Sequence, residues 1–151
     1  MGLTDVVGTE RLALDTVAFI YFIEEHPVFL PLVEPIFRGA DAGDREIVTS
    51  AVTLLEVLVV PYRAGDLSLA ERYEVLLTGS RGVRLVGLDR VQLRAAAQLR
   101  AVHGVRTPDA LQLAAALSER CQALVTNDRR LPAIAGLRIV QLRDLLPGAG
   151  T

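Results

Sequence analysis

Five short apolar segments, each four to six residues long, are spaced along the chain with helical patterns between them. They are Arg11–Leu14, Glu46–Thr49, Val83–Leu88, Ala123–Thr126 and Arg138–Leu142. Four of them are nearly continuous in apolar character, as is typical of strands that are covered on both faces. Strands that alternate with helices predict an α/β fold, here a three-layer α/β/α domain with a central parallel sheet of four to five strands.

The segments between these strands carry helix-start signals. The pattern Ser68-Leu69-Ala70-Glu71 has the form of a capping box. Asp89 is placed to cap a helix that begins at Arg90. Thr107-Pro108 predicts an N-cap followed by proline at the first helical position, where the missing N–H costs nothing.

A chain of 151 residues is the size of one domain, and no repeat or long linker divides it. We expect the domain to cover residues 11–146, with an N-terminal extension (1–10) and a C-terminal tail (147–151). The extension carries acids and lacks the apolar core of a signal peptide. No stretch reaches the roughly 20 apolar residues of a membrane span. The sequence therefore predicts a soluble protein of the cytoplasm that does not bind membranes.

Several chemistries are excluded by residue type. Cys121 is the single cysteine, so an internal disulfide and a thiolate zinc cluster are excluded. The histidines are isolated: we interpret His26-Pro27 as a turn that stops a helix, and His103 as a helix C-terminal residue. All 16 Lys and Arg residues are arginine, which excludes a Walker-type phosphate loop and Schiff-base catalysis. The net charge of −2 neither indicates nor excludes binding to nucleic acid.

Two aspartates come at or just after the ends of predicted strands. Asp15 follows Leu14 directly, and Asp128 comes two residues after Thr126. Because ligands of an open parallel sheet bind beyond the carboxyl ends of its strands, we expect both aspartates at the same edge. Taken singly, each is explained equally well as the cap of the next helix.

Two further acids lie inside helical patterns. Glu56 sits in the apolar segment Thr53–Val60, where helical periodicity leaves no wide polar stripe around it. A charged carboxylate there is partly desolvated and has to be paired, protonated or metal-bound. Asp109 begins a helix so rich in alanine and leucine that it should pack closely in the core, which places Asp109 at the sheet edge. A favourable charge at the helix start explains Asp109 as well.

Four converging carboxylates repel one another and raise one another's pKa. A hard divalent cation resolves this, because Mg²⁺ and Mn²⁺ prefer carboxylate and water ligands. We therefore interpret the four acids as the catalytic and metal-binding residues of a site for metal-assisted hydrolysis of a phosphodiester: Asp15, Glu56, Asp109 and Asp128.

The segments around these acids are Leu14-Asp15-Thr16, Thr53-Leu54-Leu55-Glu56-Val57, Thr107-Pro108-Asp109-Ala110 and Thr126-Asn127-Asp128-Arg129. In order and spacing they resemble the four acidic motifs of PIN domains, specifically of VapC-like proteins, and the resemblance covers about residues 11 to 145. It implies a parallel sheet flanked by helices and a Mg²⁺- or Mn²⁺-dependent endoribonuclease. In many members it also implies a toxin with a cognate antitoxin.

Carried over by position, the resemblance implies that Asp15 and Asp109 are the principal metal ligands. Glu56 and Asp128 would complete the pocket, directly or through water. The polar groups behind the acids would come from Thr126, with Thr16 and Asn127. Local strand-end and turn hydrogen bonding explains these last three equally well.

Arginines are the expected RNA contacts, because the guanidinium group suits phosphate. Arg106, Arg129 and Arg130 lie nearest the acidic motifs in sequence, although a solvated surface charge explains each of them too. The apolar segments Val17–Ile23 and Pro31–Phe37 are expected in the core. Part of their surface would otherwise bind an antitoxin helix or a second copy, and we expect a homodimer.

Three functions stay open at this stage. The first is the metal-dependent endoribonuclease that acts as the toxin of a VapBC-type pair. The second is another enzyme on a similar scaffold, either a DNA nuclease or a phosphatase. A haloacid-dehalogenase-type phosphatase is disfavoured, because Val17 stands where it needs a second aspartate and its lysine is absent. The third is a PIN-like module that binds RNA or protein without cutting and without toxicity.

Overall fold

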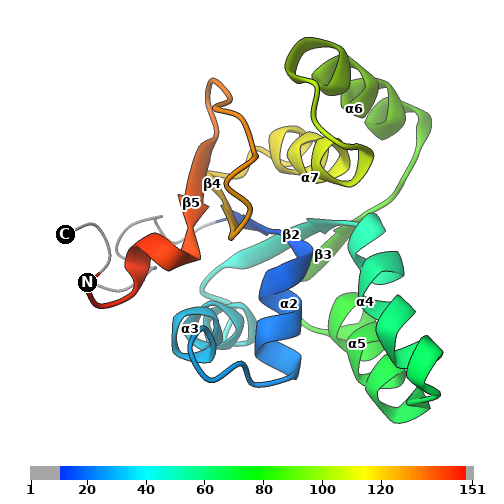
Figure 1. The fold of residues 1–151 in the computed structure, drawn as a ribbon, viewed down its shortest axis with the longest axis vertical. Coiled ribbons are helices and arrows are strands. Elements are labelled where there is room, and N and C mark those ends of the chain that lie inside the picture. The colour runs from blue at the N-terminus through cyan, green and yellow to red at the C-terminus, as the bar shows by residue number, and fades with distance from the viewer. Residues whose placement is uncertain (1–10, 149–151) are drawn as a thin grey trace.

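The computed structural model describes residues 11–148, which form a five-stranded sheet between two layers of helices (Figure 1). The strands are β1 (Arg11–Leu14), β2 (Glu46–Ser50), β3 (Val83–Val86), β4 (Ala123–Thr126) and β5 (Arg138–Gln141). They lie in the order β3-β2-β1-β4-β5, and every neighbouring pair is parallel. The predicted three-layer α/β/α fold is confirmed. The predicted third strand was two residues too long, because β3 ends at Val86.

Helices α2 (Thr16–Ile23), α3 (Leu30–Asp41), α4 (Val52–Ala64) and α5 (Leu67–Gly79) share one apolar core with one face of the sheet. Helices α6 (Arg90–His103) and α7 (Thr107–Ser118) cover the other face. Alternation along β1 produces this division, because Leu12 and Leu14 point into the first core and Ala13 into the second. A 3₁₀ helix, η1 (Leu142–Leu145), follows β5.

Local polar contacts set the starts of α5 and α6. The predicted capping box at Ser68 is wrong: α5 begins at Leu67, and its N-cap Asp66 accepts a hydrogen bond from the backbone N–H of Leu69 at 3.0 Å. Asp66 satisfies an unpaired N–H of the first turn one position before the helix, so Ser68 lies inside the helix. The predicted cap of α6 is confirmed, since Asp89 accepts from the N–H of Gln92 at 2.9 Å.

Helix α7 is the most deeply packed helix of the described chain. Every residue from Asp109 to Ala116 is buried, between the sheet on one side and α6 on the other, as the alanine-rich sequence predicts. Its N-cap is Arg106 rather than the predicted Thr107, and Pro108 is the second helical residue. The shift is harmless because the first-turn N–H groups have no intrahelical acceptor.

Both histidines have structural positions. Helix α2 ends at Ile23, and Nδ1 of His26 accepts hydrogen bonds from the N–H groups of Val28 and Phe29 at 3.1 and 3.2 Å, so the predicted turn is confirmed. His103 is the last residue of α6, as predicted. Within residues 11–148, no helix is both long enough and apolar enough to cross a bilayer.

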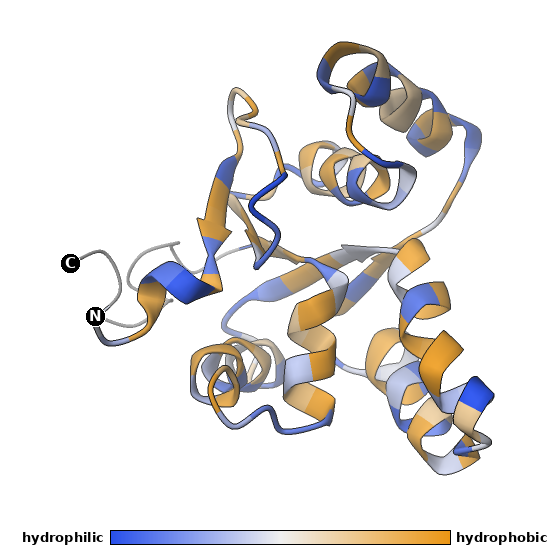
Figure 2. Ribbon diagram, viewed as in Figure 1, coloured by the Kyte–Doolittle hydropathy of each residue, from blue (hydrophilic) through white to orange (hydrophobic). Residues whose placement is uncertain are grey.

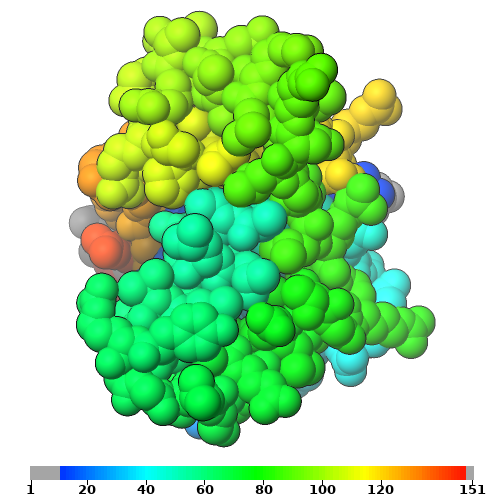
Figure 3. Space-filling view, turned by 90° about the vertical axis from the view of Figure 1, so that its right-hand side faces the viewer, coloured from blue at the N-terminus to red at the C-terminus, as the bar shows by residue number. Residues whose placement is uncertain are grey.

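The apolar segments of α2 and α3 supply core residues, as predicted: Phe19 and Ile36 are fully buried. Exposed apolar side chains lie instead on α4 and α5, where Leu55, Val60 and Leu67 are each more than half exposed. Helix α6 carries others, among them Val91 and Val102. Figure 2 shows hydrophobic stretches along both α4 and α5, and Figure 3 looks onto the face that these two helices form with α6 above them. Residues 1–10, the predicted extension, and 149–151 lie outside the described part, so the predicted domain boundaries stay a prediction.

Candidate active site

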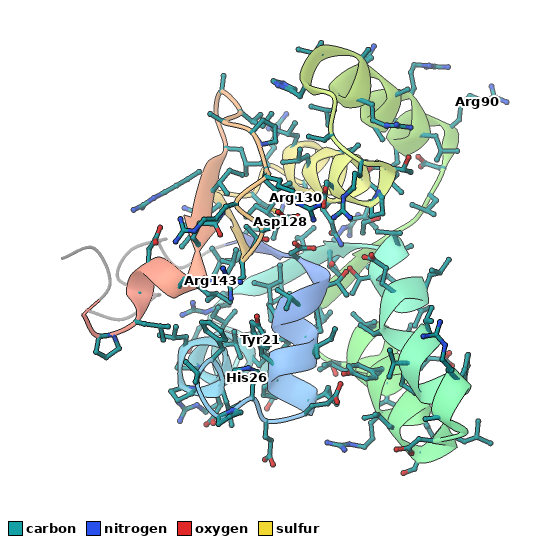
Figure 4. All side chains as sticks on the ribbon, viewed as in Figure 1. Tyr21, His26, Arg90, Asp128, Arg130 and Arg143 are labelled. Carbon is teal, nitrogen blue, oxygen red and sulfur yellow. The ribbon has the colours of Figure 1, made fainter. Side chains whose placement is uncertain are left out.

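Four carboxylates from four different elements line one pocket of about 390 Å³. Asp15 follows β1, Asp128 lies just beyond β4, Glu56 is on α4, and Asp109 is in the first turn of α7. Parallel strands bring their carboxyl ends to the same edge, and α7 begins at that edge. The structure therefore brings together all four acids that the sequence predicts. Figure 4 labels one of them, Asp128, beside Arg130.

Asp15 is the most deeply placed of the acids that follow strands. Its Oδ1 accepts from the N–H of Thr16 at 2.7 Å, and its Oδ2 accepts from the hydroxyl of Thr126 at 2.8 Å. Burial raises the pKa of Asp15, an effect that these two hydrogen bonds oppose. The nearby carboxylates of Asp109 and Glu56 raise the same pKa further, so negative charge is concentrated at this point.

Glu56 is held by a hydrogen bond rather than buried among apolar side chains. Its Oε1 accepts a hydrogen bond from the hydroxyl of Thr16 at 2.6 Å. Val59 and Val60, which the helical pattern places beside it, are exposed, and Glu56 itself is half-buried. The apolar surroundings expected from the sequence are therefore incomplete, and the hydroxyl of Thr16 decides how this carboxylate is oriented.

A buried amide beneath the pocket was missed by sequence reasoning. Nε2 of Gln112 donates to the hydroxyl of Thr53 at 2.7 Å, and its Oε1 accepts from the N–H of Ser50 at 3.1 Å. Thr53 in turn contacts Thr49, whose hydroxyl reaches the carbonyl of Leu14 at 2.9 Å. These bonds tie α7, α4, β2 and β1 together directly behind the acids. A glutamine in the otherwise apolar segment 110–116 was the available signal.

Arginines form ion pairs with the other two acids, Asp109 and Asp128. Nε of Arg106 lies 3.2 Å from Oδ2 of Asp109, and its Nη2 lies 3.5 Å from Oδ2 of Asp128. Arg130 grips Asp128 with two nitrogens, Nε at 2.9 Å from Oδ1 and Nη2 at 3.0 Å from Oδ2. The bond from Arg130 is the largest cause that lowers the pKa of Asp128, and the charge of Arg106 adds to it.

The remaining predicted residues divide into two groups. Thr16 and Thr126 hold the carboxylates of Glu56 and Asp15, and Asn127 donates to the hydroxyl of Tyr21 at 3.1 Å. Arg129 does not line the pocket and instead pairs with Asp144 at 2.7 Å. Arg143, which sequence reasoning missed, does line the pocket.

The donor set fits a hard divalent cation in chemistry and in charge. Asp15 and the two carboxylates that act on it electrostatically, Asp109 and Glu56, supply the oxygen ligands that Mg²⁺ and Mn²⁺ prefer. Within residues 11–148, no three His, Cys, Asp or Glu side chains meet at ligating distance. Each of the four carboxylates is instead held by a nearby hydroxyl, backbone amide or guanidinium donor.

The Asp15→Asn variant is expected to be more stable than the wild type at about pH 7 in EDTA. Burial raises the folded-state pKa of Asp15 above its unfolded value, so the wild type loses folding free energy as the pH rises above 3.8, and the loss is complete once the pH exceeds the raised pKa. Below the ordinary value of 3.8, Asp15 is protonated in both states and the advantage of the variant disappears. Calorimetric melting of both proteins from about pH 3 to 7 checks this. A difference of about 1 kcal/mol in the free energy of unfolding shifts Tm by about 3 °C at this chain length. A variant that melts below the wild type at neutral pH contradicts it.

Comparison of the sequence with family models identifies one family, and comparison with solved structures identifies similar folds. A family model described as PIN domain matches residues 12–137. The structure is similar to VapBC2 from Rickettsia felis bound to a DNA fragment from their promoter, with TM-score 0.68 and 17% identity over 87% of this chain and 98% of that chain. It is also similar to a DNA-bound VapBC from Salmonella typhimurium, with TM-score 0.61 and 24% identity over 88% and 98%. A toxin–antitoxin complex from Klebsiella pneumoniae matches with TM-score 0.62 and 19% identity over 83% and 94%. No curated protein sequence matches.

Proposed function

This chain belongs to the PIN domain family, and from that membership we propose that it is a metal-dependent endoribonuclease, the toxin of a VapBC-type toxin–antitoxin pair. The observation that carries the proposal is the single pocket lined by Asp15, Glu56, Asp109 and Asp128 at the carboxyl edge of the sheet. Burial chiefly raises the pKa of Asp15, and the carboxylates of Asp109 and Glu56 add to the rise, which supports a site where a cation would offset negative charge.

Each acid has a distinct part in the proposed reaction. Asp15 and Asp109 hold Mg²⁺ or Mn²⁺, which when bound lowers the pKa of water and offsets charge on the phosphodiester. Glu56 is fixed by Thr16 through Oε1, which leaves Oε2 to orient the attacking water and accept its proton. Thr126 keeps the carboxylate of Asp15 turned into the pocket.

Asp128 has a different part, because its carboxylate is already held by two guanidinium groups. Arg130 binds both of its oxygens, and Arg106 bridges from Asp128 to Asp109. We propose that Asp128 chiefly positions these cations at the mouth of the pocket. To serve also as a metal ligand, as the family resemblance implies, it would exchange an arginine for the cation.

A cognate antitoxin is the proposed protein partner, and the chain is expected to form a homodimer. Support for the antitoxin comes from similarity to structures described as VapBC and toxin–antitoxin complexes. The exposed apolar side chains of α4 and α5, among them Leu55, Val60 and Leu67, supply the kind of surface that a partner covers. Both partners remain predictions.

Cleavage of a mixed pool of labelled RNAs tests the proposed function. Purified protein is expected to cut RNA in Mg²⁺ or Mn²⁺ and to lose activity in EDTA, because a bound cation would be needed to lower the pKa of the attacking water. DNA of the same sequences, run in parallel, separates the ribonuclease from a DNA nuclease. The protein heated beyond unfolding is the control for contaminating nuclease.

Cutting that persists in EDTA would contradict the metal-dependent mechanism. Binding of Mn²⁺ by calorimetry without cleavage of any RNA would favour the binding module instead. Cleavage of DNA alone would move the assignment to the DNA nuclease.

A further inference from the structure

Arginines near the acidic pocket differ in whether their charge is already used. Arg106 pairs with Asp109 and Asp128, Arg130 with Asp128, and Arg129 with Asp144. Arg143 also lines the pocket, and its guanidinium makes no ion pair or hydrogen bond with the rest of residues 11–148. Its positive charge is therefore free to meet a ligand.

The backbone of Arg143 is held firmly although its side chain is exposed. Its N–H donates to Oδ1 of Asn127 at 3.0 Å, and the amide of Asn127 donates in turn to Tyr21. The neighbouring Leu142 is fully buried and anchors η1 to the core. Nε2 of Gln141 donates to the carbonyl of Asp128 at 3.0 Å. These contacts fix the start of η1 against the loop that carries Asp128.

A polyanionic substrate needs a positive charge at the pocket that no carboxylate already neutralises. RNA that enters the pocket meets four carboxylates, while the charges of Arg106 and Arg130 are already shared with two of them. A guanidinium without a carboxylate partner at the pocket wall gives a phosphate an attractive contact beside the acids. Figure 4 shows Arg143 on the side of the site toward Tyr21, with Arg90 at the far end of the molecule.

We propose that Arg143 binds a backbone phosphate of RNA next to the one that is cleaved and so holds the strand across the acidic pocket. The inference rests on the proposed ribonuclease function. On this proposal the principal phosphate contact is Arg143, which lies in η1 just after β5, rather than the three arginines nearest the acidic motifs in the sequence.

Binding of a fluorescent single-stranded RNA to the Arg143→Ala variant tests this inference, by anisotropy in EDTA over a series of salt concentrations. Loss of one charge-assisted contact is expected to raise Kd about tenfold. It is also expected to reduce the slope of log K against log salt by about 0.7. Arg143→Lys should retain the slope and recover part of the affinity, because lysine keeps the charge without the planar fork.

The matched control is Arg90→Ala, which removes an exposed arginine on α6 remote from the pocket and should leave both quantities unchanged. In Mn²⁺, Arg143→Ala should raise KM for cleavage more than it lowers kcat, with Mn²⁺ affinity by calorimetry unchanged. If wild type cuts RNA while Arg143→Ala keeps the wild-type Kd and KM, or if Arg90→Ala loses as much, the inference is overturned and the function stands. If wild-type protein neither binds nor cuts RNA, the proposed function fails and this inference fails with it.

Discussion

Asp109→Asn is expected to reduce RNA cleavage at least about 100-fold and to weaken Mn²⁺ binding by a similar factor. Asp109 is buried at the start of α7, and its carboxylate acts electrostatically on Asp15 across the pocket. Groups that only support metal ligands are commonly worth 10- to 100-fold, so loss of a ligand itself should cost no less. Single-turnover cleavage and calorimetric Mn²⁺ titration measure the two effects.

The matched control is Asp144→Asn, which removes an exposed carboxylate paired with Arg129 outside the pocket and should leave cleavage and metal binding unchanged. Asp128→Asn should reduce cleavage and Mn²⁺ binding less than Asp109→Asn does and more than Asp144→Asn does. It releases Arg130 and Arg106, while the three remaining acids stay in place. Circular dichroism confirms that each variant folds. Wild-type Mn²⁺ affinity in a folded Asp109→Asn variant would remove Asp109 from the proposed ligand set.

Gln112→Ala is expected to lower the free energy of unfolding by about 3 kcal/mol. The substitution leaves the N–H of Ser50 buried without its acceptor and deprives the hydroxyl of Thr53 of its donor. It also opens a cavity behind the acids, between α7 and β2. At this chain length the loss corresponds to a fall in Tm of roughly 10 °C. Urea unfolding followed by circular dichroism measures it.

Two further variants separate hydrogen bonding from packing at this position. Gln112→Met keeps most of the volume but none of the bonds, so it should remain destabilised by about 2 kcal/mol. Gln98→Ala removes an exposed glutamine on α6 and should change stability by less than about 0.5 kcal/mol. If Gln112→Met is as stable as the wild type, packing rather than the hydrogen bonds carries the effect.

The architecture and the four acids could be predicted because their causes are local. Continuous apolar runs predict strands buried on both faces, and alternation with helices predicts a parallel sheet. Asp15 follows β1 directly, Asp128 comes two residues after the end of β4, and a parallel sheet brings such residues to one edge. The positions of Asp15 and Asp128 at strand ends were therefore enough to predict that they meet, whereas Glu56 and Asp109 reach the pocket from helices α4 and α7.

Helix starts were harder to predict, because several residues within two positions compete for the same cap. Asp66 rather than Ser68 begins α5, and Arg106 rather than Thr107 precedes α7. Such shifts cost little free energy, since alternative polar groups satisfy the first-turn N–H groups nearly as well.

Polar side chains far apart in the sequence find their partners only in the tertiary structure. Arg106 bridges to Asp128, 22 residues away, and Gln112 meets Thr53 across 59 residues. Arg129, adjacent to Asp128 in the sequence, pairs with Asp144 outside the pocket. Arg143, which lies in η1 after β5, lines the pocket. For these two arginines, Arg129 and Arg143, proximity in the sequence predicts the reverse. Residue types and periodicity thus determine which elements form and which acids face one edge, but long side chains select their partners by distance and burial, which exist only once the chain has folded.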